Sequence, residues 1–223
     1  MTILLAIETS TEMASIALLS ERGIISRELA GVQTHSQGVL PAIQEILKEA
    51  CITLRQCNAI AFGCGPGAFT GVRTACGIVQ GLAFGADLPI IPVVSLLAMA
   101  QAAYDPGAEA DFVCVLDARM GEVYWAHYRS QNQCWVEVTE PALSTAEQVL
   151  LYANSMKVAL VLGNGAMPNI SSASEQIINR MPHAEYVAKL ALLDFSKGKQ
   201  LRADQALAAV PGARVCAAHH RGR

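Results

Sequence analysis

The order of the apolar stretches is the feature that most constrains how this chain folds. Three short apolar runs, at residues 3–7, 14–19 and 24–29, are joined by tight polar turns, which predicts an antiparallel meander. The apolar spacing then becomes helical over 36–50, and short strands alternate with helices as far as residue 116. Strands followed by alternating helices and strands predict an α/β fold with mixed sheets flanked by helices.

This order of elements is also that of the ribonuclease-H-like unit found in actin, sugar kinases and their relatives. The second half of the chain is less regular. There we expect strands at 123–128, 135–138 and 158–162 and helices at 145–153, 175–180 and 186–196. We predict two lobes and a tail: an N-terminal lobe over 1–104, a partly degenerate C-terminal lobe over 110–205, and an atypical tail over 206–223.

Composition and charge exclude several classes of protein. Apolar residues make up 52% of the 223 residues, which is enough for a large core. The chain has 16 Lys and Arg against 19 Asp and Glu, a net charge of −3, so we expect no direct grip on nucleic acid. No apolar run approaches the length of a membrane helix, about 18 residues, and the start lacks a signal-peptide pattern. With seven scattered cysteines, this predicts a reducing, cytoplasmic location away from membranes.

The most unusual stretch is a glycine-rich loop at residues 63–73, which follows a predicted strand and precedes a predicted helix. Such a loop can present backbone N–H groups to an anion, with Gly65, Gly67, Thr70 and Arg73 as the candidate residues. No lysine follows, so the loop is not a P-loop. The alternative is a tight structural turn in which Gly65 and Gly67 adopt backbone angles closed to other residues.

Two polar turns are further candidates. Glu8, Thr9 and Ser10 close the first strand, at the place where actin-like ATPases hold the phosphates and metal of a nucleotide; the alternative is a plain polar turn between two strands. Asp117 forms a possible catalytic pair with Glu122, although the intervening arginine favours a charge-balanced turn instead. The sequence has no H-x-x-x-H, H-E-x-x-H, zinc-type cysteine or G-x-S-x-G pattern, so we expect no metal site and no hydrolase nucleophile.

Two of the predicted helices carry unusual stripes. Gly77, Gly81 and Gly85 recur every four residues on one face of the helix at 71–86, and each lowers helix stability by ~1 kcal/mol relative to alanine. Such a stripe allows another backbone to approach closely, either within the same domain or from a partner. The helix at 36–50 carries a wide apolar stripe, part of which we expect to be exposed: Leu40, Ile43 and Leu47.

Three stretches together closely resemble the TsaB family (older name YeaZ), the bacterial accessory proteins of tRNA threonylcarbamoyladenosine synthesis. They read ILLAIETSTEMASIAL, AFGCGPGAFTGVR and DARMGEVYWAHY. The resemblance is strong over residues 1–130 and implies the actin-like, two-lobed fold. The metal-binding H-x-x-x-H motif of the related catalytic subunit TsaD is incomplete here, because His35 has no partner four residues on. The family's usual P-x-Y-L-R ending is replaced by an Ala-, Gly- and Arg-rich tail.

The resemblance implies a non-catalytic scaffold that binds TsaD and, with TsaE, supports threonylcarbamoyl transfer to adenosine 37 of tRNAs reading codons that begin with A. ATP and a metal ion would then belong to the partner subunits, tRNA would be contacted only indirectly, and the chain alone would form a possible homodimer. The family's mode of pairing implies an interface of Leu40, Ile43, Leu47, Gly77, Gly81 and Gly85. The alternative function is an active actin-like ATPase or a peptidase. If the chain is a scaffold, the other candidate site residues form a vestigial nucleotide site or a structural loop: Glu8, Thr9, Ser10, Gly65, Gly67, Thr70, Arg73 and Asp117.

Overall fold

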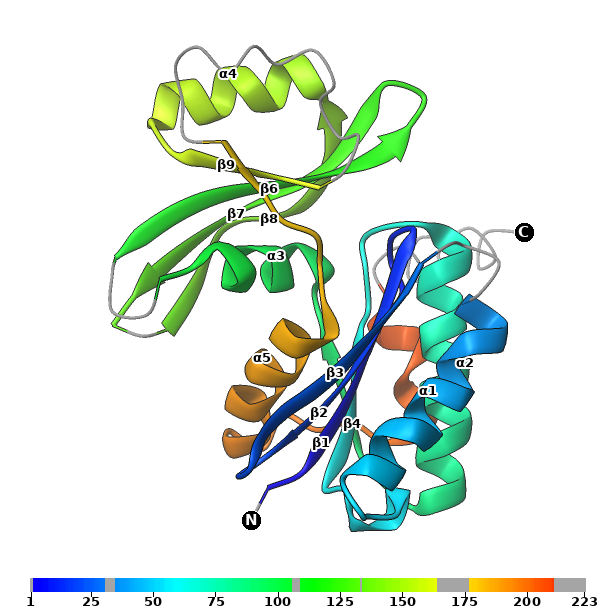
Figure 1. Cartoon of the computed structure of the whole chain (residues 1–223). Helices are drawn as coiled ribbons and strands as arrows, with labels where there is room; N and C mark the ends of the chain where they lie inside the picture. Colours follow the sequence, from blue (N-terminus) through cyan, green and yellow to red (C-terminus); the bar gives the residue numbers. More distant parts are fainter. Residues whose placement is uncertain (1, 31–34, 106–108, 133, 164–176, 211–223) are drawn as a thin grey trace, which may run out of the picture. The chain divides into compact units, whose positions relative to one another are not determined.

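The computed structural model describes residues 2–30, 35–105, 109–132, 134–163 and 177–210. The chain divides into two compact units (Figure 1). Unit 1 comprises Met1–Ser95 and His183–Arg223, and unit 2 comprises Leu96–Pro182. The boundary predicted near residues 104–109 differs from this division, and the return of the chain to the first unit was not predicted. That return depends on packing between segments far apart in the sequence, which no local pattern reveals.

Unit 1 is built on a five-stranded mixed sheet with the strand order β3-β2-β1-β4-β5. The first three strands pair antiparallel, as the predicted meander requires, and β4 and β5 add to β1 in parallel. The strands of this sheet are β1 (Leu4–Glu8), β2 (Met13–Ser20), β3 (Gly23–Ala30), β4 (Ala59–Gly63) and β5 (Ile90–Val93). This arrangement confirms the predicted mixed sheet.

Helices cover both faces of this sheet. Figure 1 shows α1 (His35–Glu49) and α2 (Phe69–Ala86) on one face and α5 (Ala184–Ser196) on the other. Every residue of β1 and β4 is buried as a result, which is why these strands read as continuous apolar runs rather than alternating ones.

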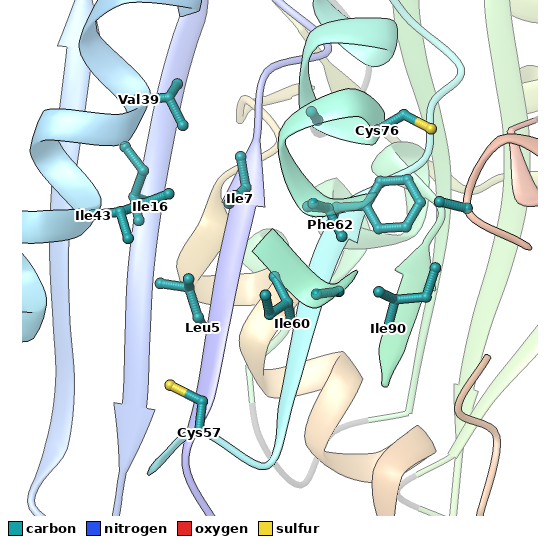
Figure 2. Packing of buried hydrophobic residues seen from close by; sticks show 14 of the residues in the cluster. Leu5, Ile7, Ile16, Val39, Ile43, Cys57, Ile60, Phe62, Cys76 and Ile90 are labelled. Atoms are coloured by element: carbon teal, nitrogen blue, oxygen red, sulfur yellow. The ribbon is translucent and has the colours of Figure 1, made fainter. Parts of the chain in front are cut away.

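The core of unit 1 lies between the sheet and the pair α1 and α2. Figure 2 shows Ile7 of β1 and Phe62 of β4 among these buried side chains, with Val39 and Ile43 of α1 and Cys76 of α2. Ile43 is only 3% exposed, so its place on a partly exposed stripe is corrected: its side chain belongs to the core. Helical periodicity identifies the apolar face of α1 but not how far the sheet covers it.

Unit 2 carries a second five-stranded mixed sheet with the strand order β10-β9-β6-β7-β8. Its strands are β6 (Ala110–Arg119), β7 (Glu122–Gln131), β8 (Cys134–Thr145), β9 (Ala159–Leu162) and β10 (Ile177–Asn179). Figure 1 shows α4 (Ala146–Met156) on one face and α3 (Ser95–Ala103) on the other. The predicted helix at 175–180 is wrong for its described part, because Ile177–Asn179 pairs in parallel with β9.

The chain beyond α5 returns to the core of unit 1 through two short 3₁₀ helices, η3 (Ala203–Gln205) and η4 (Leu207–Ala209). Ala206, between them, is fully buried in the unit 1 cluster. The part of the predicted tail that the structure describes therefore belongs to the folded unit, while residues 211–223 lie outside the described residues. None of the described helices is long and apolar enough to cross a membrane.

The burial of Ala206 gives a prediction. Ala206→Asp places a carboxylate in the core, so we expect the free energy of unfolding to fall by about 3 kcal/mol or more. The matched control is Leu207→Asp, because the neighbouring side chain is 51% exposed and its replacement leaves the core intact. Thermal unfolding of the two variants measures the difference, and equal melting temperatures would contradict the placement of Ala206.

Candidate functional site

The polar turn after β1 and the glycine-rich loop after β4 meet at one edge of the unit 1 sheet. β1 and β4 are parallel neighbours, so the segments that follow them leave the sheet on the same side. The turn consists of Glu8, Thr9 and Ser10, all of which are buried. Ser95, which follows β5, reaches the same edge because β5 pairs in parallel with β4. The turn candidates and the glycines of the loop are thus brought together here.

Glu8 is completely buried, and donors of unit 1 engage both of its carboxyl oxygens. The backbone N–H of Ser10 donates to Oε1 at 2.6 Å, and the hydroxyl of Ser95 donates to Oε2 at 2.9 Å. Burial raises the pKa of Glu8 above its ordinary value, and these hydrogen bonds only partly oppose the shift. Burial and the nearby Glu8 carboxyl also raise the pKa of Cys64 to about 12. These environments favour neutral side chains.

Thr9 and Ser10 hold the start of α2. The Thr9 hydroxyl donates to the carbonyl of Gly71 at 2.7 Å, within the first turn of the helix. The carbonyl of Ser10 accepts a hydrogen bond from the backbone N–H of Ala68, the N-cap of α2, at 2.6 Å. An amide that a bound anion would need is therefore already satisfied by the turn.

Three glycines of the loop allow the turn Glu8–Ser10 to pack directly against the loop and the start of α2. A Cβ atom on Gly63 would overlap the Glu8 carboxyl, one on Gly67 the Ser10 carbonyl, and one on Gly71 the Thr9 carbonyl. Each overlap is closer than non-bonded heavy atoms can lie, so side chains at these positions force the turn away.

The loop glycines were expected to adopt angles closed to other residues. Gly65 does so, with φ of +93°. Gly67 does not have a positive φ, so that part of the expectation is corrected: it is a glycine because the turn packs directly on it.

The other loop candidates face away from this contact. Arg73 lies on the exposed side of α2, with its guanidinium carbon 3.9 Å from the centroid of the Phe69 ring. The Thr70 carbonyl accepts a bond from the Thr74 hydroxyl at 2.8 Å, an ordinary contact inside a helix.

Asp117 belongs to unit 2 and closes the turn between β6 and β7. Its Oδ1 accepts a hydrogen bond from the backbone N–H of Arg119 at 2.9 Å, and both residues are exposed. Met120 and Gly121, the two residues between the paired Arg119 and Glu122, adopt left-handed angles, with φ of 56° and 81°, as a tight hairpin turn requires. This geometry supports a turn-forming role for Asp117, although it bonds the backbone of Arg119 rather than balancing its charge.

The glycine stripe of α2 is exposed. No heavy atom of the described residues lies within 4 Å of a Cβ built on Gly77, Gly81 or Gly85, apart from their own chain neighbours and helix backbone. The alternative that the stripe packs inside the domain is therefore wrong for the described chain. Phe84 beside it is 84% exposed and Phe69 at its start is 68% exposed. We call the exposed set Phe69, Arg73, Gly77, Gly81, Phe84 and Gly85 the α2 face.

The predicted contribution of α1 to this surface is smaller than expected. Leu40 is 43% exposed, whereas Leu47 is partly buried and packs against the core that holds Ile43. Of the three α1 candidates, Leu40 is the one available to a partner.

Sequence reasoning assigned no role to His127, which is fully buried in unit 2. Its Nε2 lies 2.9 Å from Oδ1 of Asp111, and its Nδ1 lies 2.9 Å from the hydroxyl of Tyr152. Arg129 donates to the same carboxylate at 2.8 Å. This chain of polar groups ties α4 to β6 and β7. Alternation along β7 places His127 and Arg129 on one face, which is the signal that would have grouped them. No cluster of three metal-ligating side chains occurs among the described residues.

The contrast between two glycines of α2 gives a prediction. Gly71→Ala should lower the free energy of unfolding by about 2 kcal/mol, because the new methyl overlaps the Thr9 carbonyl. Gly77→Ala, on the open side of the same helix, should raise it by about 0.5–1 kcal/mol. Thermal unfolding measures both, and the same sign for the two variants would contradict the arrangement described here.

Comparison with known proteins places this geometry in a family. A family model described as TsaD, tRNA N6-adenosine threonylcarbamoyltransferase, matches residues 12–209. The chain is similar to the tRNA threonylcarbamoyladenosine biosynthesis protein TsaB of Escherichia coli (strain K12), with 36% identity over 211 residues, or 91% of each chain. Its identity to TsaB of Haemophilus influenzae is 54% over 125 residues, which are 55% of this chain and 52% of that protein.

A solved structure agrees with these matches. YeaZ from Pseudomonas aeruginosa superimposes with a TM-score of 0.82 at 36% identity, over 92% of this chain and 98% of that one. This match confirms the predicted actin-like, ribonuclease-H-like fold. The family model covers most of the chain, and E. coli TsaB aligns with nearly all of it, so this chain belongs to the TsaB family.

Proposed function

We propose that this chain is a non-catalytic scaffold subunit of tRNA threonylcarbamoyladenosine synthesis. It binds the catalytic subunit TsaD through the α2 face and, with TsaE, supports transfer of the threonylcarbamoyl group to adenosine 37 of tRNAs reading codons that begin with A. Membership of the TsaB family supports the pathway. The observation that carries the binding role is the exposed glycine stripe, flanked by two exposed phenylalanines.

The glycine stripe lowers the stability of α2 in the isolated chain. Its three glycines weaken α2 by about 3 kcal/mol together, and nothing in the described chain uses the space that they leave. A helix that lacks side chains along one face allows a second helix to pack at an unusually short distance. The loss of helix stability is therefore explained if a partner helix packs against the three glycines.

The aromatic residues at the two ends of the α2 face suit an interface. Large aromatic side chains carry much of the binding energy at interfaces, whereas isolated proteins seldom leave them fully exposed. Phe84 projects beside the stripe, and Phe69 lies under the guanidinium of Arg73. Leu40 of α1 adds apolar area. In the absence of TsaD, we propose that the same face pairs with a second copy of the chain.

The turn and loop geometry supports a scaffold over an ATPase. Glu8 and Thr9, the residues of the alternative nucleotide site, are bound to Ser95 and Gly71 of the same unit. We propose that ATP and the metal ion are held by the partner subunits. The net charge of −3 supports a role in which another subunit binds the tRNA.

Reconstitution tests the proposal. Threonylcarbamoyladenosine formation is measured with this chain, TsaD and TsaE, and with each subunit omitted in turn, and binding to TsaD is measured by calorimetric titration. The chain alone is assayed for hydrolysis of ATP and of peptides. We expect a measurable affinity for TsaD, modification that requires this chain, and no hydrolysis by the chain alone. Modification that is independent of this chain would refute the scaffold role, and hydrolysis by the chain alone would favour the enzyme alternative.

A substitution in the stripe gives a sharper prediction. Gly81→Leu adds a side chain where a partner helix has to pass, so we expect affinity for TsaD to fall at least tenfold and modification to fall with it. The protein should remain folded, because no described atom occupies the new space. Ser155→Leu, which adds the same side chain to the exposed surface of α4, is the control. Unchanged affinity of the Gly81→Leu protein would remove the stripe from the interface.

A further inference from the structure

A histidine side chain holds one of the amides that open α5. The first amides of an α-helix need partners outside the regular helical pattern. The third and fourth amides of α5 donate to the backbone carbonyl of His183 at 3.0 and 3.1 Å, and the first, that of Ala184, donates to the hydroxyl of Ser15 at 2.9 Å. The second amide, that of Glu185, donates to Nδ1 of the His183 ring at 3.1 Å. The Glu185 amide therefore depends on a ring that can gain a proton.

This contact fixes where the His183 ring carries its proton. A backbone N–H can only donate, so Nδ1 of His183 has to present a lone pair. The proton of the neutral ring is then on Nε2, which lies 3.3 Å from Oε1 of Glu28 on β3. The N-cap of α5 exists only in this form of the ring, because a proton on Nδ1 would occupy the position of the Glu185 N–H.

The charged and titratable groups around His183 come from β3 and from α5. Glu28 of β3 is at ion-pair distance from the ring, and its side chain is 59% exposed. The carboxylate of Glu185 is already paired with Nζ of Lys189 at 2.7 Å. That Nζ also lies 4.9 Å from the centroid of the Tyr186 ring, which meets the His183 ring edge-on at 6.3 Å between centroids. Glu28 is therefore the acid that is available to attract a charged His183 ring.

We propose that His183 is a pH-sensitive N-cap of α5, which holds the Glu185 amide while its ring is neutral and releases that amide when Nδ1 takes up a proton from water. Histidine is the side chain whose charge changes between about pH 5 and pH 8. In the charged ring both nitrogens are donors, and the positive charge lies at the N-terminal end of a helix, where the dipole disfavours it. Glu28 attracts the charged ring, so a hydrogen bond is exchanged for an ion pair. This device is independent of TsaD binding.

The cap and the ion pair act on stability in opposite directions. The cap stabilises α5 while the ring is neutral, and its contribution is lost as the pH falls and the ring becomes charged. The attraction of Glu28 for the ring grows over the same range, so the melting temperature of the whole protein reports only their sum. The amide of Glu185 reports the cap alone. The amides of Ala184 and Val187 are held by uncharged oxygen atoms, so they serve as internal references.

Nuclear magnetic resonance of the full chain, labelled with ¹⁵N, tests the proposal at pH 8 and pH 5. The ring nitrogen signals show which nitrogen of His183 carries the proton. Hydrogen exchange gives the protection of each amide relative to its rate in an unfolded chain. We expect the Nε2–H form at pH 8 and a protection of Glu185 that falls about fivefold between pH 8 and pH 5. The protection of Ala184 and Val187 should be the same at both pH values.

Four variants separate the cap from its surroundings. His183→Asn provides an uncharged acceptor, so the protection of Glu185 should stay high at both pH values, whereas His183→Ala should leave it low at both. Glu28→Gln removes the neighbouring carboxylate, so the loss of protection should need a lower pH. The control is Thr145→Ala, because the Thr145 hydroxyl caps α4 by accepting the N–H of Gln148 at 3.3 Å and does not titrate in this range. It should lower the protection of Gln148 equally at pH 8 and pH 5.

Three results would overturn the proposal. The first is a ring that carries its proton on Nδ1 at pH 8. The second is equal protection of Glu185 at pH 8 and pH 5 in a protein whose ring signals show that His183 has become charged. The third is a His183→Asn protein in which the protection of Glu185 depends on pH as strongly as in the wild type. If His183→Ala does not fold, the wild-type ring signals and the His183→Asn protein decide the question.

Discussion

The close contact between the turn Glu8–Ser10 and the glycine-rich loop is the constraint on which the rest of unit 1 depends. The turn lies against Gly63, Gly67 and Gly71, where any side chain would displace it. Through this contact the end of β1 is bonded to the start of α2 and to the start of α3. A loop of glycines is needed wherever a backbone approaches this closely, whether the approaching group is a phosphate or another part of the same chain.

Most elements could be predicted from sequence because their signals are local. Short apolar runs bounded by polar turns locate the first strands to within a few residues, and helical spacing locates α1 and α2. Where the prediction failed, the cause is non-local. Ile177–Asn179 is a strand because β9 offers an edge to pair with, and Ala206 is buried because the chain turns back onto α2. β8 extends well beyond residues 135–138, since an edge strand tolerates Pro141.

The candidate site could be located from the sequence, but its chemistry could not be settled. Glu8, Thr9 and the loop glycines are the residue types that bind a phosphate, and also those that allow two segments of one unit to pack closely. The contact between Glu8 and Ser95 favours close packing within unit 1, and the sequence contains no signal for a bond across 87 positions. The side of α2 on which the glycine stripe lies follows more directly from the sequence. Val72, Cys76 and Val79 form the buried side of α2, and the stripe lies opposite them.

The two sides of α2 are physically linked. A helix with three glycines on its open face has low intrinsic stability, so its ends need to be held by the rest of the unit. At the N-terminal end, the turn supplies the Ser10 carbonyl and the Thr9 hydroxyl. At the C-terminal end, Asp87 adopts a left-handed angle with φ of 56°, and the Leu88 N–H bonds the Ala83 carbonyl at 2.9 Å. A helix whose ends are held in this way can present a bare face to a partner without fraying. This explains why the tightly packed N-terminal end and the open glycine stripe occur on the same helix.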